Sequence, residues 1–202
     1  MKSHSQRIAG SISMALNPFL LLPFVFIIAL FLTNFPTVQS QLKWAGVIFI
    51  ANIIIPFGWI HYLDYKGVIL DDTLAYHKLH RQRLKALIPI IIVVAFEILL
   101  MLIFQHYNPL FAVFISGFTV SVISGIISYF WKISAHMIGL STTITLLTLL
   151  LGWWVLWSAI FIPAIIWARL KLHRHTLLQL LIGFIVPPII ILFIFNSFKL
   201  LS

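Results

Sequence analysis

The chain contains no cysteine and very few acidic residues. Without cysteine it has no disulfide framework, no thiolate nucleophile and no cysteine-ligated metal site. Only four of its 202 residues are Asp or Glu, and charged residues of both signs make up 8% of the chain. A soluble domain carries about 25% charged residues. The composition therefore excludes an ordinary water-soluble protein and indicates an integral membrane protein.

Apolar residues make up 62% of the chain, and its mean hydropathy is +1.12. They form long runs rather than the alternation of a barrel strand, and a helix satisfies its own backbone groups in hydrocarbon. We predict an all-α fold, a polytopic transmembrane bundle of about six or seven spans. The formal charge of +9 comes from short loops between apolar runs, which favours phosphorylated or anionic lipids over nucleic acid as partners.

Seven apolar stretches approach the roughly 20 residues that a membrane-spanning helix needs. Gly152 alone separates the fifth from the sixth, but one helix over 135–170 would be about 54 Å long, too long for one crossing. We interpret the N-terminal run as a retained helix, because no convincing small-x-small cleavage site follows it. The predicted spans are residues 16–35, 43–62, 86–105, 110–130, 135–151, 152–170 and 177–198.

Two short polar clusters interrupt this apolar chain. Lys132, Ser134 and His136 stand at the start of the fifth span, and Arg169 and His175 follow at the end of the sixth. Two predicted spans lie between the clusters, so both emerge on one face of the membrane, with the polar loop after the second span. The positive-inside rule places this face in the cytoplasm, in a bacterial inner (plasma) membrane. Eleven of the thirteen Lys and Arg fall on it: positions 2, 7, 66, 78, 81, 83, 85, 132, 169, 171 and 174.

These residue types suit phosphate chemistry. Cations bind phosphate oxygens, one histidine can act as a nucleophile and another as an acid. The segment 132–136 also opens a predicted helix, whose free amides and positive dipole end attract an anion. Alternatively, histidines and cations at the interface cap helices and meet lipid headgroups, which is the interpretation we favour for His4, His61 and His173.

Both clusters resemble motifs of the type 2 phosphatidic acid phosphatase superfamily, the integral-membrane lipid phosphatases related to vanadium haloperoxidases. That family has the motifs K-x6-R-P, P-S-G-H and S-R-x5-H-x3-D. The second resembles Ile133-Ser134-Ala135-His136, and the third resembles Ala168-Arg169 followed by His175 and Gln179. The resemblance covers roughly residues 60–198. We therefore divide the chain into N-terminal transmembrane helices at 1–60 and a phosphatidic acid phosphatase-like core at 61–202.

The resemblance implies a role for each residue. His175 would attack phosphorus and form a phosphohistidine, and His136 would protonate the leaving lipid alkoxide. This fits the physics of phosphoryl transfer, which depends on positioning and on neutralising the phosphoryl oxygens. No metal and no cofactor is implied. The groups that would bind the phosphate are Lys132, Ser134, the backbone amide of Ala135, Arg169 and, from the first motif, Arg83.

The chain departs from the family pattern in each motif. Ala135 replaces glycine, which is tolerable where its φ is negative. The first motif is poorly matched; Arg81 and Arg83 are its candidates, and Arg83 is preferred because it lies closer to the third span. Gln179 replaces the aspartate that orients the nucleophilic histidine. In a Ser-His-Asp triad, replacing the acid by its amide costs about 10^4-fold in rate.

The loss of that aspartate leaves two ways to orient the nucleophile. Gln179 can still accept a hydrogen bond from the histidine ring through its carbonyl oxygen, so orientation can survive while the charge does not. A carboxylate could also come from the loop, where Asp71 and Asp72 are candidates.

Three functions remain open. The first is a membrane phosphatase that hydrolyses a lipid phosphate or a polyprenyl diphosphate through a phosphohistidine, and this is the one we expect. The second is a non-catalytic relative that binds a lipid phosphate, which Gln179 and the weak first motif favour. The third is a histidine-box di-iron oxidase, suggested by His77, His80 and the pair at 173 and 175. The chain lacks the double-histidine box and most of the carboxylates that such a site needs.

Glu97 lies in the middle of the third predicted span. An ionisable residue there is a candidate functional group by default. The alternative is a protonated side chain that is hydrogen-bonded to serine or threonine of the 119–128 or 141–148 stretches. At about 1.5 Å per residue, Glu97 lies about 15 Å from the face that carries the clusters. We therefore expect it to take no part in chemistry at that face.

Overall fold

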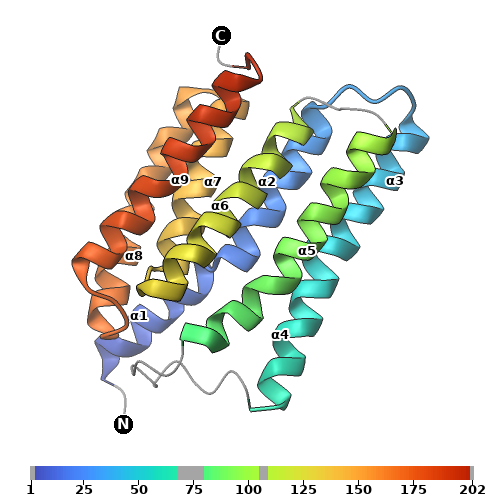
Figure 1. Ribbon diagram of the computed structural model, residues 1–202. Helices are drawn as coiled ribbons and strands as arrows, with labels where there is room; N and C mark the ends of the chain where they lie inside the picture. Colours follow the sequence, from blue (N-terminus) through green and yellow to red (C-terminus); the bar gives the residue numbers. More distant parts are fainter. Residues whose placement is uncertain (1–2, 68–79, 105–108, 201–202) are drawn as a thin grey trace.

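The computed structural model describes residues 3–67, 80–104 and 109–200, except for the side chains of residues 19 and 80–86. The regular elements among these residues are all helices, which run side by side in one bundle (Figure 1). This confirms the all-α prediction. The elements are α1 (His4–Ala15), α2 (Pro18–Leu32), α3 (Val38–Phe49), the π-helix η1 (Ile50–Ile54), α4 (Ile55–Tyr65), α5 (His80–Phe104), α6 (Leu110–Phe130), α7 (Ala135–Leu151), the 3-10 helix η3 (Trp153–Ile160), α8 (Phe161–Lys171) and α9 (Leu177–Ser197).

In the described part of the chain, six helical segments are long and apolar enough to cross a membrane. The helix α7 is also apolar but shorter, at 17 residues. The predicted spans 110–130 and 135–151 coincide with α6 and α7, and the last two differ from the observed helices by one residue at their ends. These helices fit the prediction of an integral membrane bundle by their length and composition.

The first two spans begin earlier than predicted. The segment His4–Leu32 has 29 residues and Val38–Tyr65 has 28, whereas the predicted spans start at residues 16 and 43. The reason is that both segments open with polar turns stabilised by capping boxes, Ser3 with Gln6 and Thr37 with Ser40. An apolar run does not include such turns, so the predicted start at residue 43 was wrong. The predicted start at residue 16 lies within two residues of Pro18, where α2 begins, but it leaves out α1.

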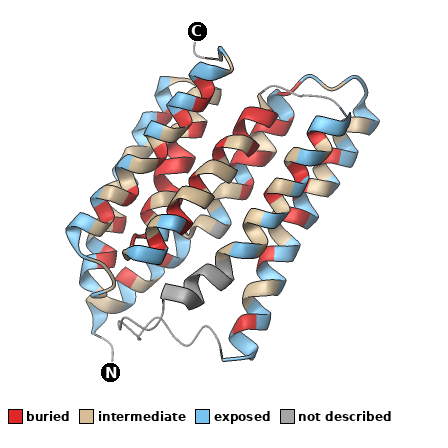
Figure 2. Cartoon of the chain, in the orientation of Figure 1, coloured by how far each residue is buried: buried red, intermediate tan, exposed pale blue. Residues whose placement is uncertain are grey.

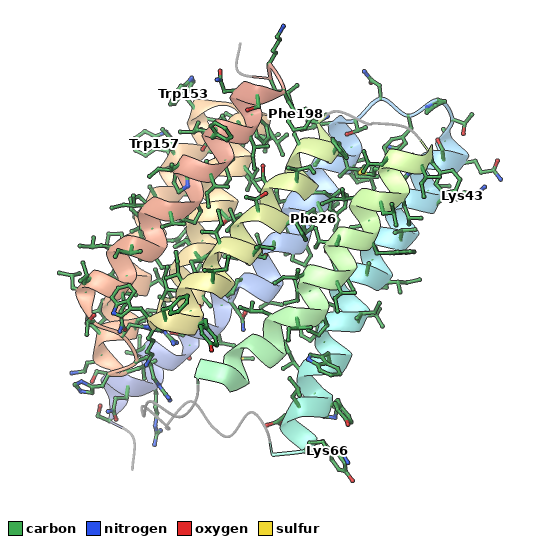
Figure 3. All side chains as sticks on the ribbon, in the orientation of Figure 1. Phe26, Lys43, Lys66, Trp153, Trp157 and Phe198 are labelled. Atoms are coloured by element: carbon green, nitrogen blue, oxygen red, sulfur yellow. The ribbon has the colours of Figure 1, made fainter. Side chains whose placement is uncertain are left out.

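The fifth and sixth spans are separated at Gly152, as predicted. Its φ of 100° lies in the left-handed region that glycine enters without steric cost. The 3-10 helix η3 follows directly, and two of its tryptophans point outward from the bundle (Figure 3). Trp153 and Trp157 are 80% and 86% exposed, which fits an interfacial belt of aromatic side chains.

The best-packed part of the bundle lies along α6 and α7, where buried residues gather (Figure 2). Phe26 of α2 stacks on Phe114 of α6 with ring centroids 4.8 Å apart, so α2 belongs to the same core. One hydrophobic cluster therefore contains residues from both sides of position 60. Two glycines allow close approach: a Cβ on Gly139 would overlap Pro18, and one on Gly183 would lie 3.2 Å from the backbone oxygen of Ser134.

The two polar clusters meet at one end of the bundle. Figure 1 places the N-terminus, the end of α4, the α6–α7 turn and the α8–α9 turn at the same end, opposite the C-terminus. This agrees with the prediction that segments 131–136 and 169–176 share one face. Which side of the membrane that face meets stays a prediction.

Candidate functional site

The α6–α7 turn places Ser134 directly before the first residue of α7. Its Oγ accepts a hydrogen bond from the backbone N–H of Met137 at 3.4 Å, so the side chain caps the helix. Ser134 is fully buried, whereas Ala135 is exposed at the first helical position, where the N–H has no partner inside the helix. Among the described non-glycine residues only His173 and Lys199 have positive φ, so Ala135 meets the condition for replacing glycine. Lys132 is half-buried just before this turn.

His136 and Arg169 are brought together by a residue of α1. The Nε2 of His136 lies 3.1 Å from the backbone oxygen of Ser13, and Nη1 of Arg169 donates to Ser13 Oγ at 3.5 Å. A carbonyl oxygen only accepts, so Nε2 of His136 carries a hydrogen and donates it. Arg169 and Ser13 are both buried, at 4% and 7% exposure.

Ser13 is a residue that the sequence did not reveal. It lies in the polar helix α1, outside the region that resembles a known family, and no local pattern separates it from Ser11 two residues earlier. Its contacts follow from the packing of α1 against α8, which is a tertiary arrangement. The site therefore includes a part of the chain that the motif comparison left out.

His175 and Gln179 form the second pair of the site. The ring Nδ1 of His175 lies 3.2 Å from Oε1 of Gln179, and this Oε1 also accepts from the backbone N–H of Thr176 at 3.1 Å. Because a backbone N–H only donates, the shared atom is the amide oxygen and Nδ1 of His175 must carry the hydrogen. The neutral ring then has its lone pair on Nε2.

Gln179 also has a structural role at the start of α9. Thr176 and Gln179 form a capping box, in which Thr176 Oγ1 accepts from the backbone N–H of Gln179 at 3.4 Å. The pattern Thr-x-x-Gln is a recognisable sequence signal for such a box. The glutamine therefore caps the helix and orients the histidine with the same oxygen.

The turn between α8 and α9 is a Schellman motif, which fixes Arg169 relative to His175. The backbone N–H of Arg174 donates to the oxygen of Arg169 at 3.0 Å, and that of His173 donates to the oxygen of Leu170 at 2.9 Å. His173 adopts φ 53°, where glycine is usual. Farther along α9, the close approach at Gly183 holds this helix against the start of α7.

Comparison with protein-family models, with curated proteins and with solved structures finds no match to this chain. The site is therefore interpreted from its own geometry and chemistry.

Several predicted groups lie outside the described part of the chain. These are the side chain of Arg83 and that of Arg81, in the first turns of α5, and the loop residues Asp71 and Asp72. His77 and the side chain of His80 fall there as well. Among the described residues, no group of three or more His, Asp or Glu side chains could hold a metal ion. The di-iron alternative thus has no ligand set in the part of the molecule that the structure describes.

Glu97 is fully buried in α5, and its partner differs from the one predicted. Nδ2 of Asn52 donates to Oε1 of Glu97 at 2.8 Å and also to the backbone oxygen of Ile48 at 3.3 Å. The expectation of a serine or threonine partner from 119–128 or 141–148 was wrong. Asn52 lies in the π-helix η1, whose wider turn changes which residues face α5.

The described groups are of the kinds that bind and transfer phosphate. Arg169 supplies a buried cation, and the first turn of α7 supplies a backbone amide at the positive end of a helix dipole. His136 presents an N–H, and His175 presents a nitrogen lone pair. Nothing in this set requires a redox group.

Proposed function

We propose that this chain is a membrane phosphatase of the type 2 phosphatidic acid phosphatase kind, which hydrolyses a lipid phosphate or a polyprenyl diphosphate through a phosphohistidine. The observation that carries the proposal is the orientation of His175. Its Nδ1–H is held by Gln179 Oε1, so the neutral ring carries its lone pair on Nε2, the nitrogen that would attack phosphorus. The two motifs lie at the same end of the bundle, which supports one shared site.

The proposed reaction has two steps. In the first, Nε2 of His175 attacks phosphorus and the bond from phosphorus to the leaving oxygen breaks. That oxygen takes a proton from the imidazolium form of His136, so the lipid leaves as an alcohol or, from a diphosphate, as a lipid monophosphate. In the second, water attacks the phosphohistidine while His136, now neutral, takes a proton from that water, and the phosphorus–nitrogen bond breaks to release phosphate. Arg169, Lys132 and the amide of Ala135 neutralise the phosphoryl oxygens in both steps.

The α1 helix bears directly on this mechanism. The hydrogen on Nε2 of His136 is donated to the backbone oxygen of Ser13, so this oxygen and the leaving oxygen of a substrate compete for the same hydrogen. Arg169 likewise contacts Ser13. Substrate binding therefore involves an exchange of partners at Ser13.

The test is phosphate release by the detergent-purified full chain from phosphatidic acid, phosphatidylglycerol phosphate and undecaprenyl diphosphate. His175→Ala should abolish release, because no other group at this turn offers the oriented lone pair. The matched control is His173→Ala, which removes an exposed histidine two residues away and should leave release unchanged. Release from none of the three substrates by a folded protein would overturn the enzymatic proposal.

A second candidate is a non-catalytic protein that binds a lipid phosphate, and the neutrality of Gln179 favours it. Gln179→Glu keeps the length of the side chain and the capping box while it adds a carboxylate beside Nδ1 of His175. For an impaired enzyme we expect at least about tenfold faster release, because the carboxylate stabilises the charged form of the ring. Binding of phosphatidic acid with no release by either protein would favour the binding role.

A further inference from the structure

A cavity of about 140 Å³ lies inside the bundle, bounded by α2, α5, α6, α7 and the region of Asn52. Its α7 wall runs from Ala135 to Leu146, and its α6 wall runs from Gly117 to Ser128. The ends of each wall are eleven residues apart, which corresponds to about 16 Å along the helix axis. The cavity is therefore long and parallel to the helices, and one end lies at Ala135, next to the proposed phosphate site.

The walls of the cavity are apolar except for a few uncharged groups. No charged side chain is among the described residues that line it. The cavity exists because several residues that line it on α6 and α7 are small, and most of the other residues that line it are aliphatic or aromatic. An ion would be costly in such a chamber, whereas an uncharged apolar chain is favoured. The polar residues that line it are Asn52, Ser121, Ser124, Ser128 and Thr142.

Two of these polar groups lack a hydrogen-bond partner within the described protein. The Oγ of Ser124 and the Oγ1 of Thr142 are buried, in residues that are 5% and 2% exposed. Buried hydroxyls are nearly always hydrogen-bonded, because leaving one unpaired costs free energy. Counted along α6 and α7 from Ser128 and Ala135, they lie about 6 and about 10 Å from the site end, so their heights along the bundle differ by less than one helical turn.

From this combination we infer that the cavity binds the hydroxyl end of a neutral lipid alcohol, whose hydroxyl hydrogen-bonds to Ser124 and Thr142. A hydroxyl donates one hydrogen bond and accepts up to two, so one alcohol group can complete both side chains. The apolar walls would enclose the part of the hydrocarbon next to the hydroxyl, because a cavity of about 140 Å³ holds only a small apolar group. Lipid binding here goes beyond phosphate hydrolysis, although a lipid alcohol is also the product class that such hydrolysis releases.

The probe is oleyl alcohol carrying a diazirine on its chain, photoactivated on the purified full chain. Peptides of α6 and α7 should be labelled. Unlabelled oleyl alcohol should compete, and octadecene, which lacks the hydroxyl, should compete more weakly. Ser124→Ala and Thr142→Val should each weaken competition by the alcohol roughly two- to tenfold, the value of one net hydrogen bond. They should leave competition by octadecene unchanged.

The chain offers a matched control for each variant. Ser116 lies on α6 and Thr143 on α7; both are buried with unpartnered hydroxyls, but neither is among the residues that line the cavity. Ser116→Ala and Thr143→Val should therefore leave alcohol competition unchanged. Equal losses in the control and test variants, or equal competition by octadecene and the alcohol, would overturn the inference.

A cavity-filling variant tests the location independently. Ser121→Leu places a larger side chain on the α6 wall and should reduce labelling at least about tenfold, because overpacking leaves no room for the chain. Unchanged labelling in a folded variant would place the ligand elsewhere. If Ser121→Leu does not fold, the location is decided by comparing Ser124→Ala with Ser116→Ala and Thr142→Val with Thr143→Val. Because the readout is labelling, it can succeed or fail separately from phosphate release.

Discussion

The two sides of the bundle are packed very differently. Along α6 and α7 buried residues are frequent, and glycines let α2 and α9 approach α7 closely, whereas exposed residues outnumber buried ones along α3, α4 and α5 (Figure 2). Phe49, Phe57 and Phe96 are each about half exposed, as expected of side chains that meet lipid. Both polar clusters belong to the dense side. The proposed site, which would have to hold a nucleophile and an acid in fixed positions, thus lies on the better-packed half.

The half of the bundle formed by α3, η1, α4 and α5 contains a buried hydrogen bond between helices. Asn52 and Glu97 join η1 to α5 through one hydrogen bond inside the membrane, where few alternatives exist. The dense half relies on close packing, and the outer half relies in part on this single contact. The comparison can be tested by substitutions that disturb either the close packing at glycines or the Asn52–Glu97 hydrogen bond, but not both.

The largest effect is expected at Gly139. A methyl group there would overlap Pro18, whose ring cannot give way, so Gly139→Ala should destabilise the fold by about 1–3 kcal/mol. The control is Gly46→Ala in α3, where nothing lies within 4 Å of the added methyl. It should be neutral or stabilising by up to about 1 kcal/mol. The thermal unfolding midpoint in detergent measures both. Equal midpoints for the two variants would mean that the close approach of α2 and α7 contributes nothing.

The second effect is expected at the Asn52–Glu97 contact. Asn52→Leu removes the donor and leaves a buried carboxyl group without it, which should cost about 1–3 kcal/mol. The double variant Asn52→Leu with Glu97→Leu removes both polar groups and should recover most of that loss. The same unfolding midpoints provide the measurement. A double variant less stable than the single one would show that Glu97 has another stabilising partner.

The third effect concerns the α1 contact with the site. Ser13→Ala removes the hydroxyl that accepts from Arg169, and it should cost about 1 kcal/mol because Arg169 is buried. Ser11→Ala is the matched control, since the exposed Ser11 hydroxyl bonds only to the backbone of its own helix at Arg7. The two unfolding midpoints should differ. If they coincide, the long contact between Ser13 and Arg169 has no energetic weight.

The dense half was also the more predictable from sequence. The limits of α6, α7 and α9 are set by local signals, namely Pro109, the cap at Ser134, Gly152 and the cap at Thr176, and each acts within a few residues. The i,i+4 spacing of His175 and Gln179 likewise places them on one helical face, so their hydrogen bond could be anticipated.

What could not be predicted depends on contacts between distant segments. Ser13 reaches His136 across 123 positions of sequence, and no local pattern marks it. The partner of Glu97 depends on the π-helix η1, which departs from the regular helical period and changes the face on which Asn52 lies. Residue spacing assumes a regular helix, and for this reason the predicted serine or threonine partner was wrong.

The smallest effect is expected at His173, whose backbone conformation is unfavourable for a side chain. Its φ of 53° is a position where glycine removes a steric cost, so His173→Gly should stabilise the protein by up to about 1 kcal/mol. Because the exposed imidazole lies outside the proposed chemistry, phosphate release should not change. Leu172→Gly, one residue earlier at φ −82°, should instead destabilise the helix end. A loss of activity in His173→Gly, with the midpoint raised, would make this histidine part of the site and would revive the histidine-box alternative.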